Sequence, residues 1–296
     1  MIPIRYVEPV FRPPSEAESL ILPVTDGCSW NQCTFCEMYT APQKKFRARE
    51  DAEIVESIRL TGERYGDQVR RVFLADGDAL VLPTRRLLTI LEAIRNHMPA
   101  VRRISSYCLP RNLRKKSQAE IDELAAAGLK MVYVGAESGD DQVLAAVKKG
   151  ETFETTCEAL EKLGKAGITR SVMILNGLGG KLYSQQHAEN SARLANEVQP
   201  EYLATLVVSF PQGEQRFRAD FPEWAPLGQH ELFVEMEEFL SRLELKRTVF
   251  RSDHASNYLI LKGTLGADKE RLLAQVRQAI SAPDEARLRP AWARGL

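Results

Sequence analysis

Short apolar runs recur along most of the chain, each followed by a polar or glycine-rich break and then by a stretch with helical periodicity. The apolar runs cover residues 19–25, 71–74, 104–107, 131–134, 171–175 and 203–208. The helical stretches cover about 50–64, a segment from Thr84 onward, Ser117 to Gly128, and about 140–147, 153–166 and 184–197. Apolar strands that alternate with helices are typical of a parallel sheet covered by helices. We therefore expect an α/β fold, a partial (β/α)6 TIM-like barrel with short N- and C-terminal extensions.

The strand–helix rhythm stops after residue 210. Pro211, Pro222 and Pro226 mark an irregular stretch, and helical patterns follow at about 229–243 and 268–281, the second with Asp268 as a candidate cap. We expect lid or substrate-side elements here, and a tail from Pro283. The predicted domain organisation is an N-terminal extension at 1–17, a core barrel at 18–210 and a C-terminal extension at 211–296.

The loops that follow the six apolar runs are rich in polar residues and glycine. They cover residues 26–36, 75–80, 108–112, 135–139, 176–180 and 209–211. In parallel α/β barrels, reactive groups gather in the loops at the carboxyl ends of the strands. These loops therefore predict one shared active-site face.

Three of the five cysteines lie within nine residues of the first loop, in the pattern C-x4-C-x2-C: Cys28, Cys33 and Cys36. Three thiolates can hold three irons of a [4Fe–4S] cluster, which normally takes four cysteines. The fourth iron would then be open to an exogenous ligand. The alternative is a structural zinc site, which would want a fourth Cys or His at characteristic spacing. The four histidines all lie far away in sequence.

The remaining cysteines do not predict a second iron–sulfur cluster. Cys157 shares a helical face with Phe153 and Leu160, so we interpret it as part of the core. Cys108 follows the third strand and either faces the substrate or packs as a partly buried thiol.

Residues 27–39, GCSWNQCTFCEMY, resemble the radical S-adenosylmethionine (SAM) superfamily, near its Elp3/MiaB-like and vitamin-B12-associated groups. The usual family spacing is C-x3-C-x2-C, so this chain has one extra residue in the first gap. The resemblance implies that SAM chelates the open iron of a [4Fe–4S] cluster. One electron, from a donor such as flavodoxin or ferredoxin, then cleaves SAM to a 5′-deoxyadenosyl radical that abstracts a substrate hydrogen.

The same resemblance implies cofactor-binding residues in the other loops. Phe35 occupies the aromatic position near the adenine. The remaining candidates are Gly77 and Asp78 for the SAM amino group, Glu137 and Ser138 for the ribose and carboxylate, and Asn176 and Gly177 for the adenine region. The alternatives are plain turns that need glycine, and a helix cap at residues 137–138.

Several charged residues outside these loops are further candidates. The segment 252–258 is dense in hydrogen-bonding groups, and His254 is the candidate catalytic proton donor, unless the segment is simply a polar turn. The basic runs at 44–49 and 111–116 predict solvated edges or contacts with an anion. Within the first run, Arg47 or Arg49 is a candidate partner for the SAM carboxylate.

Composition narrows the function classes. The 40 basic and 40 acidic residues balance, which disfavours nucleic acid and anionic membrane as partners. No apolar stretch approaches the ~20 residues of a membrane span, and the first residues lack a signal-peptide pattern. We therefore expect a cytoplasmic, oxygen-sensitive enzyme that acts on a small molecule.

Three rival functions stay open. The first is an RNA-modifying radical SAM enzyme, although the chain shows no appended basic domain. The second is a vitamin-B12-dependent methyltransferase, whose cobalamin would need a partner protein because few residues precede the cysteine loop. The third is a non-enzymatic iron–sulfur sensor or scaffold.

Overall fold

The computed structural model describes residues 3–294 and contains a mostly parallel eight-stranded sheet in the order β1-β4-β5-β6-β7-β8-β9-β10. These strands are Leu20–Pro23, Arg71–Ala75, Arg103–Tyr107, Leu129–Glu137, Thr169–Asn176, Tyr202–Val207, Val249–Ser252 and Leu261–Thr264. The first six coincide with the apolar runs, so the predicted α/β fold is confirmed. The sheet does not close in the part of the chain that is described, in keeping with a partial barrel.

Beyond the six predicted strands, two short strands lie at one end of the sheet. β9 pairs parallel to β8, and β10 pairs antiparallel to β9, so the C-terminal extension widens the sheet. Both strands are four residues long and partly exposed, and neither has a continuous apolar run. A small separate sheet was missed, in which β2, Thr25–Asp26, pairs antiparallel with β3, Arg47–Ala48.

The helices follow the expected alternation. The α-helices α1 to α9 are Asp51–Tyr65, Thr84–His97, Gln118–Ala126, Asp141–Ala146, Phe153–Lys165, Gly180–Val198, Gln215–Asp220, Gln229–Arg242 and Lys269–Ser281. The 3-10 helices η1 to η5 are Pro14–Glu16, Pro42–Lys44, Ala79–Val81, Pro110–Leu113 and Ala291–Ala293.

The sequence predicts N-terminal caps for α3 and α9, and the structure confirms only the first. The capping box at α3 is confirmed, since the Ser117 hydroxyl accepts from the Glu120 backbone N–H. The predicted cap of α9 is wrong, because the Asp268 side chain accepts a hydrogen bond from the Thr264 backbone N–H at 2.7 Å rather than from its own helix.

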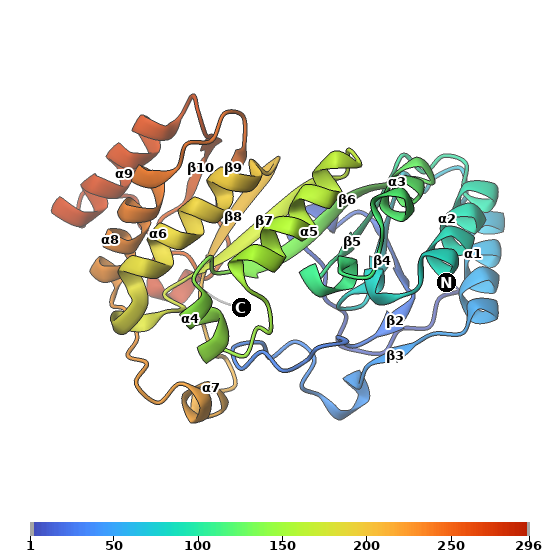
Figure 1. The fold of residues 1–296 in the computed structure, drawn as a ribbon, viewed down its shortest axis with the longest axis horizontal. Helices are drawn as coiled ribbons and strands as arrows, with labels where there is room; N and C mark the ends of the chain where they lie inside the picture. The colour runs from blue at the N-terminus through green and yellow to red at the C-terminus, as the bar shows by residue number, and fades with distance from the viewer. Residues whose placement is uncertain (1–2, 295–296) are drawn as a thin grey trace. The chain divides into compact units, whose positions relative to one another are not determined.

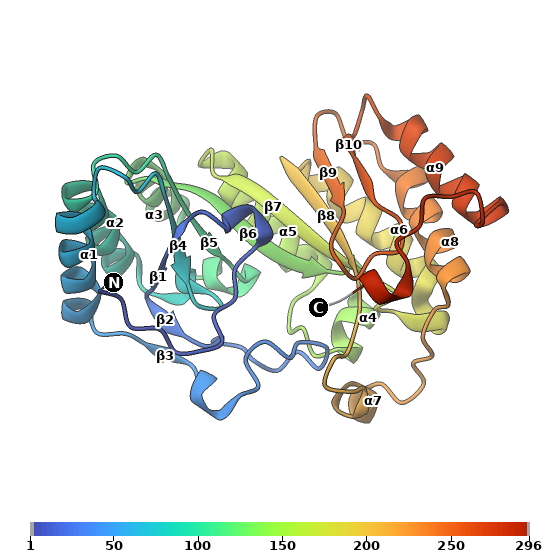
Figure 2. The same cartoon turned by 180° about the vertical axis from the view of Figure 1, so that it is seen from behind.

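The chain divides into two compact units. The first comprises Met1–Asn31, Met38–Val134 and Glu158–Arg170, and the second comprises Gln32–Glu37, Gly135–Cys157 and Ser171–Leu296. In the first unit, α1 packs on α2 and α2 on α3 beside the strands β1, β4 and β5 (Figure 1). In the second unit, α8 packs on both α6 and α9 beside the strands β7 to β10 (Figure 2). The extension and core boundaries predicted at residues 17/18 and 210/211 stay predictions.

The N-terminal extension is tied to the first unit through one buried carboxylate. Glu16 in η1 is fully buried and accepts hydrogen bonds from the Arg103 guanidinium at 2.9 Å and the Tyr133 hydroxyl at 2.6 Å. The Ser19 hydroxyl also donates to it. Burial, together with the Glu16 carboxylate, raises the pKa of Tyr133. Residues before β1 are thereby joined to the strands β5 and β6.

We expect Glu16→Ala to lower the free energy of unfolding by about 1–3 kcal/mol, because it leaves the partly buried Arg103 guanidinium without this acceptor and removes one partner of the Tyr133 hydroxyl. The matched control is Glu18→Ala, which removes an exposed carboxylate paired with Arg71 and should cost less than about 1 kcal/mol. Urea unfolding of the two variants measures the difference. Equal transition midpoints would contradict the anchoring role of Glu16.

Candidate functional site

The first part of the cysteine loop packs directly on the loop after β4. The Gly77 backbone N–H donates to the Gly27 carbonyl at 2.9 Å, and the Gly27 N–H donates to the Asp76 carboxylate at 3.1 Å. A Cβ atom on Gly77 would lie 2.9 Å from Cβ and 3.0 Å from Cα of Cys28. Gly77 is therefore a contact residue of the first cysteine, which leaves no room for a side chain.

Asp78, predicted to bind the SAM amino group, lies completely buried under the same loop. Its carboxylate accepts from the Ser29 backbone N–H at 2.9 Å, from the Ser29 hydroxyl, and from the Asn112 amide at 3.1 Å. Burial raises the pKa of Asp78, and these hydrogen bonds offset part of that rise. Both carboxylate oxygens thus bind donors of the chain itself, and the predicted contact with SAM stays a prediction.

Trp30, also in the cysteine loop, is held by a contact with Arg111. The guanidinium carbon of Arg111 lies 3.5 Å from the ring centroid of Trp30, a cation–π contact. Further along the basic run 111–116, Lys116 is buried and donates to the Leu82 carbonyl at 2.7 Å, and burial lowers its pKa. This run is therefore not simply a solvated edge.

Three basic residues of the run 44–49 are paired with aspartates, and two of them, Lys44 and Arg49, are buried. Lys44 is 1% exposed and lies 2.6 Å from the Asp76 carboxylate. Arg47 and Arg49 each bind one oxygen of Asp26 through two nitrogens, with the shorter distance 2.7 Å in both pairs. Burial alone would raise the pKa of Asp26, but the two guanidinium groups hold it below its usual range.

These pairs change the interpretation of the arginines. Arg47 and Arg49 were candidates for the SAM carboxylate, but the structure joins both to Asp26 across the β2–β3 sheet. Sequence reasoning missed Asp26, Asp76 and Lys44. One sequence feature could have indicated the two aspartates: each stands directly before a glycine of its loop, Gly27 or Gly77.

The second part of the cysteine loop belongs to the second unit. The Cys36 backbone N–H donates to the Cys33 carbonyl at 3.3 Å, and the Thr34 N–H donates to the Val147 carbonyl at 3.1 Å. Phe35, between them, packs against a buried apolar cluster that includes Val147. The backbone around the second and third cysteines is therefore a turn fastened to the segment that follows β6.

The five cysteines differ in burial. Cys28 and Cys36 are partly exposed, whereas Cys33, Cys108 and Cys157 are buried, as expected for packing residues at 108 and 157. Across residues 3–294, no three His, Cys, Asp or Glu side chains are grouped closely enough to hold a metal ion. The fit to an iron–sulfur cluster rests on the donor chemistry: thiols, two of them accessible, at the spacing of one compact loop.

Glu137, at the end of β6, is a buried carboxylate with an unusual backbone conformation. Its backbone is left-handed, with φ +66°, and the side chain folds back over Gly135, where a Cβ atom would collide with Oε1. Oε1 accepts from the Lys149 ammonium at 3.2 Å, and that ammonium lies 5.9 Å from the Phe35 ring centroid. Oε2 is buried and has no hydrogen-bond partner within the described structure. One acceptor is thus available to a bound molecule.

Ser138 is already engaged by its own unit. Its hydroxyl lies 2.8 Å from Nδ1 of the buried His187 on α6 and accepts from the Asp140 backbone N–H at 3.0 Å. The Asp140 side chain in turn caps α4 by accepting from the N–H groups of Gln142 and Val143. The cap of α4 is therefore Asp140 rather than residue 137 or 138, and the ribose contact of Ser138 stays a prediction.

Asn176 and Gly177 end β7 in a turn held from the helix side. Burial alternates along β7, and Asn176 falls on the buried face together with Val172 and Ile174. Its Oδ1 atom has no hydrogen-bond partner within the described residues. Gly177 has φ +80°, and its N–H donates to the buried Glu235 carboxylate on α8 at 2.6 Å. Burial raises the pKa of Glu235. Glu235 was missed, because its helix lies far along the chain and its local pattern is that of an ordinary surface glutamate.

His254 lies in a polar turn fastened by the C-terminal tail. Its Nδ1 accepts from the Ser256 backbone N–H at 3.2 Å, and the Arg289 guanidinium donates to the His254 and Asn257 carbonyls. Burial, followed by the nearby Arg289 charge, lowers the pKa of His254. The ring is therefore neutral near pH 7, with Nδ1 as an acceptor. Its catalytic role stays a prediction.

Comparison with known proteins identifies the family and the fold. The model of the Radical SAM superfamily matches residues 22–195. No curated protein matches the chain. In residues 3–294, no helix is long and apolar enough to span a membrane.

Solved structures of radical SAM enzymes share this fold. The methyltransferase TsrM from Kitasatospora setae, solved with a SAM analog, is 21% identical over 63% of this chain and 35% of its own, with a TM-score of 0.51. A second TsrM structure contains cobalamin and a [4Fe–4S] cluster. Coproporphyrinogen III oxidase (HemN) from Escherichia coli is 17% identical over 76% of this chain and 52% of its own, at TM-score 0.56. Methylornithine synthase (PylB) is 14% identical over 92% and 74%, at TM-score 0.54. The chain thus spans about a third of TsrM and about half of HemN.

We expect Gly77→Ala to lose most of its capacity to bind iron, because the added methyl group would displace the Cys28 backbone at a cost of about 1–3 kcal/mol. The matched control is Gly228→Ala, where the nearest atom to an added Cβ is a flexible Glu231 oxygen at 3.5 Å. Iron analysis after anaerobic reconstitution measures the effect. Full iron content in Gly77→Ala would show that the contact with Cys28 is dispensable.

Proposed function

The chain belongs to the radical SAM superfamily, and on that premise we propose that it holds a [4Fe–4S] cluster on Cys28, Cys33 and Cys36 and binds SAM beside Glu137. Enzymes of this superfamily use this cluster together with SAM. The spacing of the three thiols supports their assignment as ligands, since they leave one iron without a protein ligand. Cys108 and Cys157 are left out because both lie far from the three-cysteine loop in the sequence.

The SAM site is proposed because Oε2 of Glu137 is buried and has no hydrogen-bond partner within the described residues. A buried acceptor without a partner costs about 1–3 kcal/mol, and the vicinal hydroxyls of a ribose are donors that would satisfy it. Lys149 balances the charge of the carboxylate. Phe35 lies next to Lys149 and directly before Cys36, which supports a nucleoside between the strand end and the cysteine loop.

The bound cofactors supply one electron and, from SAM, a 5′-deoxyadenosyl radical that abstracts a hydrogen atom. We propose a small molecule as the source of that hydrogen, and flavodoxin or ferredoxin as the electron donor. The chain's own residues hold SAM and limit access of water. The proposal also includes contacts of SAM with Asp78, Ser138 and Asn176. It includes His254 as the proton donor. For Asn176 and Gly177, the proposed contact is with the adenine region of SAM.

RNA is the alternative substrate class. It is disfavoured because the chain has equal numbers of basic and acidic residues, 40 each, whereas proteins that bind nucleic acid usually carry a basic surface. Purification followed by analysis of bound nucleic acid distinguishes the two. A cytoplasmic location and oxygen sensitivity belong to the same proposal.

We expect Cys28→Ala, Cys33→Ala and Cys36→Ala each to abolish stable assembly of the iron–sulfur cluster, while Cys157→Ala retains it. Iron and sulfide analysis and the charge-transfer absorption of the reconstituted proteins provide the measurement. Loss of iron from Cys157→Ala without loss of folding, or a site filled by zinc alone, would contradict the assignment.

We expect Glu137→Gln to weaken SAM binding by about 1.5–3 kcal/mol, the range for a hydrogen bond to a charged group, with iron content unchanged. Gly135→Ala should weaken it comparably, since the methyl group would take the place of the Glu137 carboxylate. The control is Glu154→Gln, on the exposed start of α5. Calorimetric titration of the cluster-loaded proteins with SAM measures the affinities. Equal affinities in all four proteins would place SAM elsewhere.

A further inference from the structure

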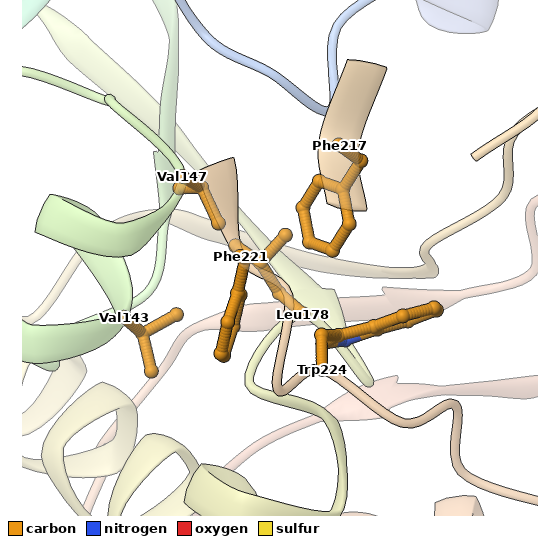
Figure 3. Packing of buried hydrophobic residues seen from close by; sticks show 6 residues of the cluster. All are labelled: Val143, Val147, Leu178, Phe217, Phe221 and Trp224. Atoms are coloured by element: carbon orange, nitrogen blue, oxygen red, sulfur yellow. The ribbon is translucent and has the colours of Figure 1, made fainter. Parts of the chain in front are cut away.

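The segment 212–225, which contains α7, lies outside the part of the chain matched by the family model. It was predicted as an irregular stretch with a lid function. Figure 3 shows instead that its large side chains converge on those of two other segments. We call this group the α7 core: Val143, Val147, Leu178, Phe217, Phe221 and Trp224. All six side chains are at most 3% exposed.

The segment contacts the cysteine loop at three places. The Arg216 guanidinium donates to the Cys36 carbonyl at 2.8 Å. The Gln212 backbone N–H donates to the Glu37 carboxylate at 3.1 Å. Phe35 packs against the α7 core.

The same segment contacts the residues that follow β6. Val143 and Val147 belong to the α7 core, and Asp220 forms an ion pair with Lys148, next to Lys149. Since the Val147 carbonyl also accepts from the Thr34 N–H, the cysteine turn and the α7 core share one support.

A third set of contacts reaches the turn after β7. The Trp224 indole N–H donates to the Gly177 carbonyl at 3.2 Å, and the Ala225 carbonyl accepts from the Lys181 N–H at 2.9 Å. A Cβ atom on Gly180 would lie 2.7 Å from that carbonyl. The tryptophan also stacks edge-on against Phe217, with ring centroids 5.0 Å apart.

We propose that the segment 212–225 is a clasp that fixes the second half of the cysteine loop against the carboxyl ends of β6 and β7, with Arg216 as the positioning residue for Cys36. The inference rests on the proposed function, in which Cys36 is a cluster ligand. A ligand loop without regular structure needs outside hydrogen bonds to keep its thiols in place, and such partners of metal ligands tune both affinity and potential. Arg216 supplies a hydrogen bond and also a positive charge, which favours the reduced, more negative state of a nearby iron–sulfur cluster.

The test compares Arg216→Gln with Arg277→Gln in the full chain after anaerobic reconstitution, without SAM. Both changes remove one exposed arginine charge, but Arg277 pairs with Glu237 on α9 and α8. We expect Arg216→Gln to release iron to a ferrous chelator several-fold faster than the native protein and to have a lower midpoint potential. Arg277→Gln should match the native protein in both respects.

Arg216→Lys tests the effect of the charge alone, because it keeps the positive charge but changes the side chain. We expect its midpoint potential to lie closer to the native value than that of Arg216→Gln. Circular dichroism of each variant establishes that it is folded. The proposed role of the segment 212–225 is wrong if folded Arg216→Gln releases iron at the rate of Arg277→Gln and keeps the native midpoint potential. That result would leave the assignment of the cluster ligands unchanged. If the native protein itself binds no iron, the proposed function fails first.

Discussion

The structure of the first unit depends on buried carboxylates that are matched, one by one, with donors. Asp26 is paired with Arg47 and Arg49, and Asp76 with Lys44. A buried charge without its partner is strongly unfavourable, so these pairs hold only when both loops are in place. The loop after β1 and the loop after β4 therefore take their conformations together. The first cysteine lies directly beside this arrangement, with Gly77 against its backbone.

The second unit fixes the other two cysteines by different means. The turn from Cys33 to Cys36 is held by backbone hydrogen bonds, by Phe35 in an apolar environment and by one arginine from α7. Apolar packing and hydrogen bonds to carbonyls tolerate small displacements better than paired buried charges do. The cysteine loop thus begins beside buried ion pairs and ends in a turn held by packing and hydrogen bonds.

The sequence was sufficient for the first six strands of the sheet, whereas the ligand role of the three cysteines stays a prediction. A buried parallel strand is apolar along most of its length, and three thiols within nine residues of one loop are typical of a metal-ligand set. It was not sufficient for β9 and β10, which are short, partly exposed strands that pair only after the sheet exists. Nor could it show that Lys44 and Arg49 are buried, because a basic run has the same local pattern whether its partners are water or distant aspartates.

The candidate site illustrates why position in a motif does not settle the role of a residue. Asp78, Glu137 and Glu235 are all buried carboxylates close to strand ends. Asp78 is saturated by Ser29 and Asn112, and Glu235 accepts from Gly177 and Ser184, so each acts on the conformation of the protein itself. Glu137 alone of these three keeps an oxygen without a partner in the described residues. A native structure leaves few buried polar groups unpaired, and Oδ1 of Asp76 and Oδ1 of Asn176 are in the same state as Oε2 of Glu137 within the described residues. The proposed ligand contact of Glu137 therefore rests on the unpaired oxygen together with the neighbouring Lys149 and Phe35. Asp78 holds the backbone at Ser29, and Glu235 holds the turn at Gly177.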